Sequence, residues 1–240
     1  MSPLRHAVAA SLTALALGAT VQAGNWPQVR GPHGQGVADE AALPSTWSPA
    51  TNVAWKTAIP GLGLSSPVVW GGDVFLSTSI SGKADSNLRV GLYGDISPVQ
   101  DDTSHEWRVY ALDKKTGAIK WQQTAYTGVP KIKRHMKSTH ASSTLATDGE
   151  RLIAFFGSEG LYAYDLKGKL LWKKDLGVLD TGYYMVPQAQ WETGSSPVLH
   201  DGRVIIQGIG ETSPLSFMVG FKYGDTSTTP FIATPSCVCR

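Results

Sequence analysis

Two loops of the sequence carry residue types that could bind a ligand or a metal ion. The first, TGVPKIKRHMKSTH at 127–140, contains two histidines, His135 and His140. Four basic side chains surround His135: Lys131, Lys133, Arg134 and Lys137. Histidines at this spacing could ligate a metal ion, but the loop offers no acidic neighbour to complete a site, so none is assigned. We interpret the segment as a solvated cationic loop that could attract an acidic ligand.

The second loop, LDTGYYMVPQAQWETG at 179–194, is rich in aromatic side chains. Its aromatic residues could stack on a ligand. Aromatic side chains more often pack against other residues of the fold, so packing is the favoured interpretation. Glu192 follows them. No catalytic residue is assigned in either loop. The candidate ligand-binding residues of the two loops are Lys131, Arg134, His135, His140, Tyr183, Tyr184 and Trp191.

A repeated pattern of strands must position these loops. An apolar strand, a glycine-containing tight turn and a second apolar strand follow Ser65, Ser142 and Ser195 in turn. Each copy predicts a β-hairpin. The copies recur about every 50 residues, as blades of a β-propeller do, once an insertion within 78–106 is set aside. The 26 glycines, 14 prolines and only 17% charged residues also favour a turn-rich, all-β chain.

A second repeated motif follows the first two hairpins, as RVYALDKKTGAIKW at 108–121 and LYAYDLKGKLLW at 161–172. An aspartate at the end of a strand accepts backbone hydrogen bonds in the next turn, and a glycine supplies the positive φ that the reversal needs. The tryptophan that follows offers an apolar plate for packing one blade against the next. These structural repeat residues are Asp113, Gly117, Trp121, Asp165, Gly168 and Trp172.

The order SSPV, glycine turn, YALDxxTGxxxW resembles the repeat of the pyrroloquinoline-quinone (PQQ)-type β-propellers. The segment WPQVRGP at 26–32 also resembles the stretch that precedes the first blade in many exported members, and the likeness covers about 25–222. The resemblance implies a partial β-propeller of four-stranded antiparallel blades, with about two complete blades and part of a third. The superfamily contains both quinoprotein dehydrogenases and scaffold proteins that bind no quinone.

Two functions remain open on this basis. We favour a non-catalytic scaffold or binding module, with no cofactor predicted. The alternative is a fragment of a PQQ-dependent quinoprotein dehydrogenase, which would require PQQ with Ca²⁺, held by acidic and amide oxygens, and a carboxylate base. The adjacent cysteine pair of several alcohol-oxidising members is missing, because Val238 separates Cys237 from Cys239, and no CxxCH haem motif occurs.

In an up-and-down blade, alternate connections fall on opposite faces. One face is expected to carry only tight turns, such as DKKTG and DLKG. The other face collects the insertion near 79–106 and the two loops described above. Long loops on one face of a rigid scaffold are the usual place for binding, so a protein partner or a small ligand is expected there.

The start of the chain reads as an export signal. Residues 1–23 combine Arg5, a short apolar run and the small-x-small sequence VQA, which predicts a secretory signal peptide cleaved before Gly24. The chain is therefore expected in the periplasm or outside the cell. With 21 basic and 19 acidic residues the formal charge is +2, which argues against nucleic acid as a partner. No apolar stretch is long enough to predict a membrane span.

Both ends of the repeat region depart from the pattern. Lys222 stands where aspartate is expected, and 223–240, rich in Thr, Ser and Pro, is interpreted as an irregular tail outside the repeat. At the other end, 53–58 resembles a fourth strand without a blade of its own. An open run of blades exposes strand edges and apolar faces, so the truncated chain is expected to self-associate.

Overall fold

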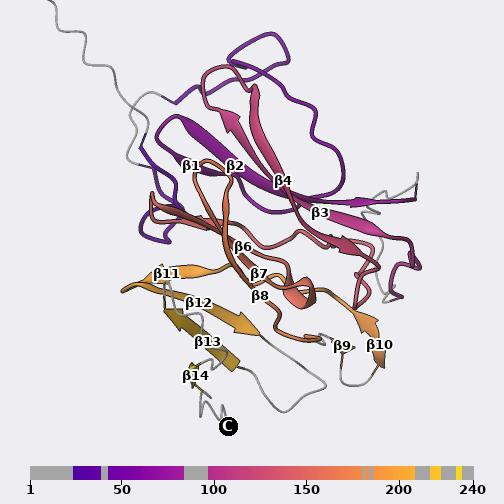
Figure 1. Ribbon diagram of the computed structural model, residues 1–240. Coiled ribbons are helices and arrows are strands. Elements are labelled where there is room, and N and C mark those ends of the chain that lie inside the picture. The colour runs from indigo at the N-terminus through magenta and orange to yellow at the C-terminus, as the bar shows by residue number, and fades with distance from the viewer. Residues whose placement is uncertain are drawn as a thin grey trace, which may run out of the picture.

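The computed structural model describes residues 24–38, 43–83, 97–179, 182–183, 186–208, 217–222 and 231–233. The predicted signal peptide lies outside these residues. Three four-stranded antiparallel sheets follow one another along the chain and are stacked in a fan (Figure 1). The fold is all-β, and its four-stranded sheets are the blades of a partial β-propeller, as the sequence predicts.

The first blade contains the longest strands of the described chain. Its two-residue turn Gly71–Gly72 aligns Trp70 with Asp73, and Gly71 takes the positive φ of 57° that such a turn requires. Residues 82–104, which include the predicted insertion, connect its second and third strands. The strands, in order from one edge, are β1 (Val68–Trp70), β2 (Asp73–Ser81), β3 (His105–Asp113) and β4 (Ile119–Gly128).

The second blade lies between the other two and is buried on both faces. Because successive side chains of a strand point to opposite faces, Leu152 and Ala154 join the core shared with the first blade. Ile153 and Phe155 join the core shared with the third. The strands are β5 (Ala146–Thr147), β6 (Arg151–Phe155), β7 (Leu161–Asp165) and β8 (Leu170–Lys174), with a short 3₁₀ helix, η1 (Gly157–Glu159), between β6 and β7.

The third blade corrects the prediction that the repeat stops at Lys222. Phe231–Ala233 forms a short strand that pairs with the preceding one, so this sheet also has four strands. The aspartate, glycine and tryptophan of the motif are missing here, but a short apolar β-prone segment can still pair through its backbone. The strands are β11 (Val198–His200), β12 (Arg203–Gly208), β13 (Phe217–Lys222) and β14 (Phe231–Ala233). A separate hairpin, β9 (Gly182–Tyr183) with β10 (Val186–Gln190), precedes this blade.

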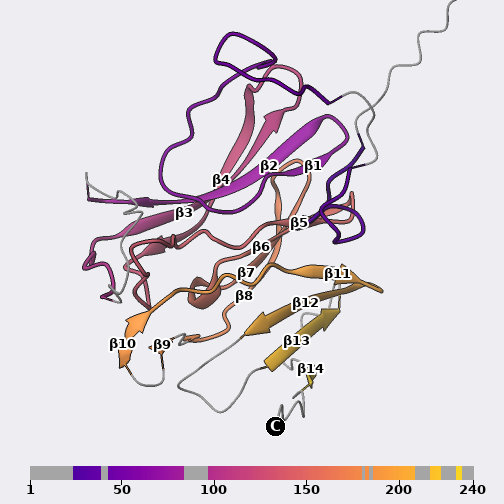
Figure 2. The same ribbon diagram turned by 180° about the vertical axis from the view of Figure 1, so that it is seen from behind.

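The innermost strands of the three blades adjoin one another, because β5 contacts both β1 and β11. Hydroxyl groups of the repeated serine motif join them: the Ser66 N–H donates to Oγ1 of Thr144 at 3.0 Å, and the Thr144 N–H donates to Oγ of Ser196 at 3.0 Å. The view from behind shows the same order of blades from β1 to β14 (Figure 2). The motif that marks each hairpin in the sequence therefore also fastens neighbouring blades.

The aspartate and glycine residues of the second motif form tight turns. Oδ1 of Asp113 accepts hydrogen bonds from the N–H groups of Lys115 and Thr116, at 3.0 and 2.8 Å. In the next blade, Asp165 accepts from two N–H groups of its own turn, both at 2.9 Å. Both turns close through glycine at positive φ: Gly117 at 71° and Gly168 at 88°.

The tryptophans of the motif join each blade to the turn of the next. Nε1 of Trp121 donates to the Leu166 carbonyl of the second blade at 3.0 Å, and its ring covers Gly168. Trp55, from the segment expected to be an unpaired strand, binds the first blade in the same way: its Nε1 donates to the Lys114 carbonyl at 3.0 Å. Trp172 packs against the core shared by the second and third blades.

Candidate functional site

The long connections between strands gather on one face, which we call the long-loop face. Its described parts are residues 97–104, 129–145, 156–160 and 186–197, which all leave the strands at the end opposite the tight turns. They lie toward the right of Figure 1, beside η1 and the β9–β10 hairpin. Because alternate connections fall on opposite faces of a blade, both candidate loops lie on the same face. Residues that the sequence did not single out lie on this face as well.

The basic loop is solvated only in part, which corrects the sequence interpretation: Lys131 and Lys137 are exposed, but its central residues are buried. Arg134 is 4% exposed and His135 2% exposed. The Arg134 guanidinium donates from Nη1 to the Ser138 carbonyl at 3.0 Å, and burial lowers its pKa. The Lys131 ammonium donates to the Ser158 carbonyl at 2.7 Å and pairs with Asp175 at 3.1 Å. The acceptors of Lys131 come from other parts of the chain, so a local reading of the loop could not reveal them.

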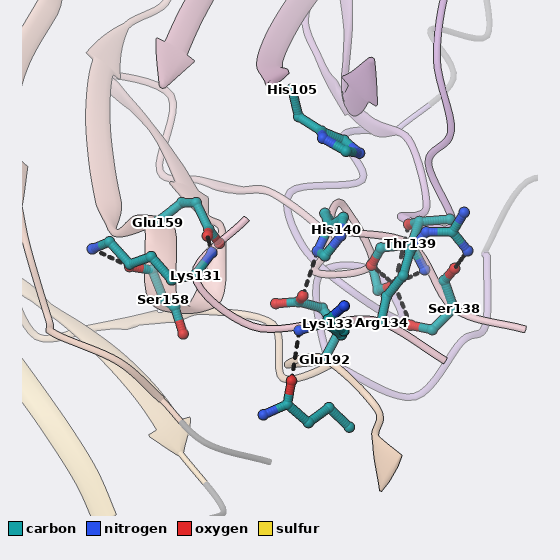
Figure 3. Close-up of polar contacts among 12 residues, drawn as sticks. His105, Lys131, Lys133, Arg134, Ser138, Thr139, His140, Ser158, Glu159 and Glu192 are labelled. Carbon is teal, nitrogen blue, oxygen red and sulfur yellow. Dashed lines mark hydrogen bonds and ion pairs between the residues drawn. The ribbon is translucent and has the colours of Figure 1, made fainter. Parts of the chain in front are cut away.

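His140 also has an acidic neighbour, contrary to the sequence interpretation. Its Nδ1 lies 2.5 Å from Oε2 of Glu192, and the two side chains are 4% and 2% exposed (Figure 3). The His140 carbonyl accepts a hydrogen bond from Nε1 of Trp107 at 2.9 Å, which fixes the backbone at the histidine. Burial lowers the pKa of His140 to about 4 and raises the pKa of Glu192 to about 8. At neutral pH the pair therefore consists of a neutral imidazole and a protonated carboxyl group.

A second buried carboxyl group belongs to Glu159, at the end of η1. Its Oε1 accepts a hydrogen bond from the Lys131 N–H at 2.9 Å. Burial, and next the Glu192 carboxyl group, raise the pKa of Glu159 to about 7. Sequence reasoning missed this residue because GSEG at 157–160 reads as an ordinary turn between two strands.

Asp101 and His105 form a further polar pair that the sequence did not indicate. Asp101 accepts hydrogen bonds from the hydroxyls of Ser81 and Thr103, both at 2.6 Å. Burial alone would raise the pKa of Asp101, but these hydrogen bonds outweigh it and hold the pKa at about 2. His105 lies 3.6 Å from this carboxylate, and its ring meets the ring of His140 edge-on at 5.3 Å. Both residues adjoin the insertion, where the sequence offers no motif.

Trp191 is an exposed member of the candidate set. It is 45% exposed and stacks on the buried His135 ring, with centroids 4.1 Å apart and planes 15° apart. The structure describes Tyr183 only as backbone in β9, and Tyr184 lies outside the described residues.

A groove of about 560 Å³ opens on the long-loop face, between the 97–104 connection and the basic loop. Its apolar walls are Pro98, Pro130 and Ile132, and Gln190, which immediately precedes Trp191, also lines it. At the groove, the Lys133 ammonium pairs with Asp102 at 3.2 Å. Such a groove has the size of a site for a small ligand or a few residues of a peptide.

Within the described part of the chain, no group of three or more His, Cys, Asp or Glu side chains is arranged to hold a metal ion. The same part contains no helix with the length and apolar character needed to cross a membrane.

The fanned four-stranded sheets, the turns of the DxxTG type and the tryptophan contacts between blades define a PQQ-type propeller repeat. A family model described as outer membrane protein assembly factor BamB matches residues 37–208, and the chain belongs to that family. A search of curated proteins gives no significant match.

Two of the solved structures that are similar to the chain illustrate this relationship. One is the quinohemoprotein alcohol dehydrogenase ADHIIG from Pseudomonas putida HK5, at 16% identity and a TM-score of 0.42, covering 84% of this chain and 25% of that one. The other is BamB from Moraxella catarrhalis, at 14% identity and a TM-score of 0.30, covering 56% of this chain and 34% of that one. The chain thus spans about a quarter and about a third of the lengths of these two proteins.

Proposed function

We propose that the chain is part of an exported, non-catalytic β-propeller scaffold that binds a partner protein through the long-loop face. The family description, an outer membrane assembly factor, supports a role in protein assembly and a location in the cell envelope. The signal peptide predicted at 1–23 supports export of the chain.

The observation that carries the proposal is the contrast between the groove and the polar cluster beneath it. The groove is open, and its lining residue Gln190 is followed in the chain by the exposed Trp191, a residue type that often anchors protein interfaces. The polar side chains below it are buried and bind one another. Arg134 donates to a backbone carbonyl, and Glu192 meets His140. A surface of this kind supports binding of a partner, and it keeps the His140 and Glu192 side chains out of contact with solvent.

The alternative is a fragment of a quinoprotein dehydrogenase. Such a protein needs a cationic side chain to pair with the carboxylates of the quinone, and it needs oxygen ligands for Ca²⁺. The described side chains fit this demand poorly, because Arg134 faces the Ser138 carbonyl and burial raises the pKa of Glu159 and Glu192, which disfavours their ionised forms. We therefore expect no stoichiometric binding when residues 24–240 are titrated with PQQ and Ca²⁺ and followed by absorbance and dye reduction. Saturable binding of one quinone per chain would favour the enzyme.

Photo-crosslinking tests the scaffold directly. A photoreactive amino acid is placed at Gln100, in the groove, and in a matched variant at Lys167, in a tight turn on the opposite face. In cells that express the chain with its signal peptide, we expect a discrete protein adduct from position 100 and none from position 167. The adduct should disappear when Trp191 is replaced by alanine. Equal labelling from both positions would contradict a binding face.

Export has its own test. N-terminal sequencing of chain isolated from the cell envelope should begin at Gly24. A chain that keeps Met1 and remains in the cytoplasm would contradict the proposed location without bearing on the binding face.

A further inference from the structure

Three connections meet at one buried cluster. We call His140, Glu159 and Glu192 the buried clasp. His140 comes from the connection between β4 and β5, Glu159 from η1, and Glu192 from the 191–197 segment that leads into β11. Figure 3 shows the three side chains drawn together from these separate elements, with the contact between His140 and Glu192 at the centre.

Both carboxyl groups of the clasp are only partly satisfied. Among the described residues, Oε2 of Glu159 and Oε1 of Glu192 have no hydrogen-bond partner, and neither does Oγ1 of Thr193. A β-carbon on Gly157 would lie only 2.9 Å from Oγ1 of Thr193 and 3.0 Å from Oε1 of Glu192, so these two oxygens pack closely over the glycine. An ionised carboxylate held in this way would have lost its hydrogen bonds to water, and protein groups would replace only some of them.

The charged groups around the clasp do not compensate two ionised glutamates. Arg134 is the cation whose charge acts on Glu192, and it acts on His140 as well. Asp101 and His105 face His140 from the first blade, and Asp101 adds a further negative charge. On the side of Glu159, the Lys131 ammonium is already engaged with Asp175 and the Ser158 carbonyl, and Tyr162 donates to the Glu159 carbonyl. With both glutamates ionised, three buried carboxylates would face one buried guanidinium.

The clasp also holds a backbone conformation that is unfavourable by itself. Glu192 has φ of 68°, in the left-handed region that side chains other than glycine seldom adopt. Its neighbour Trp191 is stacked on His135 and is 45% exposed. The Glu192 side chain is thus the link between the cluster and the position of Trp191 on the long-loop face.

We propose that the buried clasp is a proton-dependent latch: protons on Glu159 and Glu192 keep the 191–197 segment docked, and their loss releases this segment with Trp191. The step is an acid–base equilibrium in which two carboxyl groups each give one proton to water. Release places both carboxylates in water and relieves the left-handed backbone at Glu192. The consequence for partner binding rests on the proposed function, whereas the latch does not, and the test needs no partner.

The direction of the pH effect follows from the pKa values. Burial raises the pKa of Glu192 to about 8 and that of Glu159 to about 7, from 4.5 for an accessible glutamate. The docked state therefore binds more protons than the released state between about pH 4.5 and 8, and docking weakens as pH rises through this range. His140, with its pKa lowered to about 4 from 6.5, acts in the opposite sense and offsets part of the effect below pH 6.5. The uncompensated loss of docking falls between about pH 6.5 and 8.

Hydrogen exchange of residues 24–240, corrected for the intrinsic effect of pH, measures the latch. One ionising carboxyl group changes the docking equilibrium by up to about tenfold per pH unit. We expect protection of 191–197 to fall at least about tenfold from pH 6.5 to 8, while Ile153–Phe155 in β6 keeps its protection. Glu192→Gln, which keeps a group able to bind His140 and removes the ionisation, should abolish most of the fall. Glu150→Gln, at a carboxyl group that is 77% exposed, should leave the fall unchanged.

A second measurement does not depend on a variant that folds. The infrared band of a protonated carboxyl group should be present in the wild-type chain at pH 6.5 and be lost by pH 9. Absence of this band at pH 6.5 would overturn the latch. So would unchanged protection of 191–197 between pH 6.5 and 8, an equal loss of protection in β6, or the same fall in Glu192→Gln. If these results support the latch and Trp191→Ala leaves crosslinking at position 100 intact, the proposed binding face fails and the latch stands.

Discussion

Nδ1 of His140 lies 2.5 Å from Oε2 of Glu192, although the two residues are 52 positions apart and belong to different connections. Each side chain supplies what the other needs, because a buried imidazole nitrogen and a buried carboxyl oxygen would both be unsatisfied alone. The contact ties the connection between β4 and β5 to the segment that leads into β11. One hydrogen bond thus couples the connection that leads into the second blade with the connection that leads into the third.

Replacing His140 with alanine should destabilise the chain by about 3 kcal/mol, because it leaves Oε2 of Glu192 without its partner and opens a cavity beside Trp107. Urea unfolding at pH 6.5 measures the change. His200→Ala is the matched control, since the His200 side chain is 71% exposed, and should change the stability by no more than about 0.5 kcal/mol. Equal effects of the two substitutions would show that the His140 contact does not stabilise the fold.

Gly168→Ala and Gly177→Ala should differ, although both glycines have a positive φ, 88° and 73°. Alanine in the left-handed region costs about 1 kcal/mol at either position. At Gly168 the new β-carbon would lie 2.8 Å from the ring of Trp121, which its bond to Leu166 holds in place, whereas nothing lies within 4 Å at Gly177. We expect a further loss of about 1–3 kcal/mol at Gly168 alone, measured by denaturant unfolding. Trp121→Leu should reduce this difference, since it removes the obstructing ring.

The sequence predicts most of the fold because the determining signals are local. The hairpins, the aspartate and glycine turns and the tryptophan plates all recur with the repeat, and the structure contains each of them. The fourth strand of the third blade was missed, since Phe231–Ala233 pairs without the motif that marks the other blades. The bond from Ser66 to Thr144 was also hidden, because Thr144 stands where the other two copies have proline.

The candidate site was less predictable, because its contacts join residues that are distant in the sequence. The alternation of connections predicted that the two loops share one face, and the sequence pointed to both His140 and Glu192. Their contact could not be predicted, because it depends on how two blades dock. Glu159, Asp101 and His105 carry no motif at all. Burial of Arg134 and His135 depends on tertiary packing, such as the stacking of Trp191 on His135, which composition cannot reveal.

Thr144→Val should loosen the contact between the first two blades. The substitution keeps the shape of the side chain and removes Oγ1, which accepts the Ser66 N–H at 3.0 Å in a site that is 3% exposed. We expect a loss of about 1 kcal/mol, because the part-buried Ser66 N–H loses its partner. Urea unfolding measures it, with Thr124→Val as control, since Thr124 is exposed in β4 and the same change there should be nearly neutral. A neutral result for Thr144→Val would mean that apolar packing alone joins the two blades.

Asp101 should make the chain sensitive to acid. Hydrogen bonds from Ser81 and Thr103 outweigh its burial and hold its pKa at about 2 in the folded state, against 3.8 for an accessible aspartate. A carboxyl group with a lowered pKa stabilises the fold above its unfolded value, and this contribution is lost as pH falls from about 4 toward 2. The loss should reach about 2 kcal/mol in the wild-type chain. Asp101→Asn should be less stable at pH 5 and should show a shallower decline below pH 4 in urea unfolding. Asp102→Asn, at an adjacent side chain that is 76% exposed, should decline as the wild type does, and parallel curves for all three proteins would refute the role of Asp101.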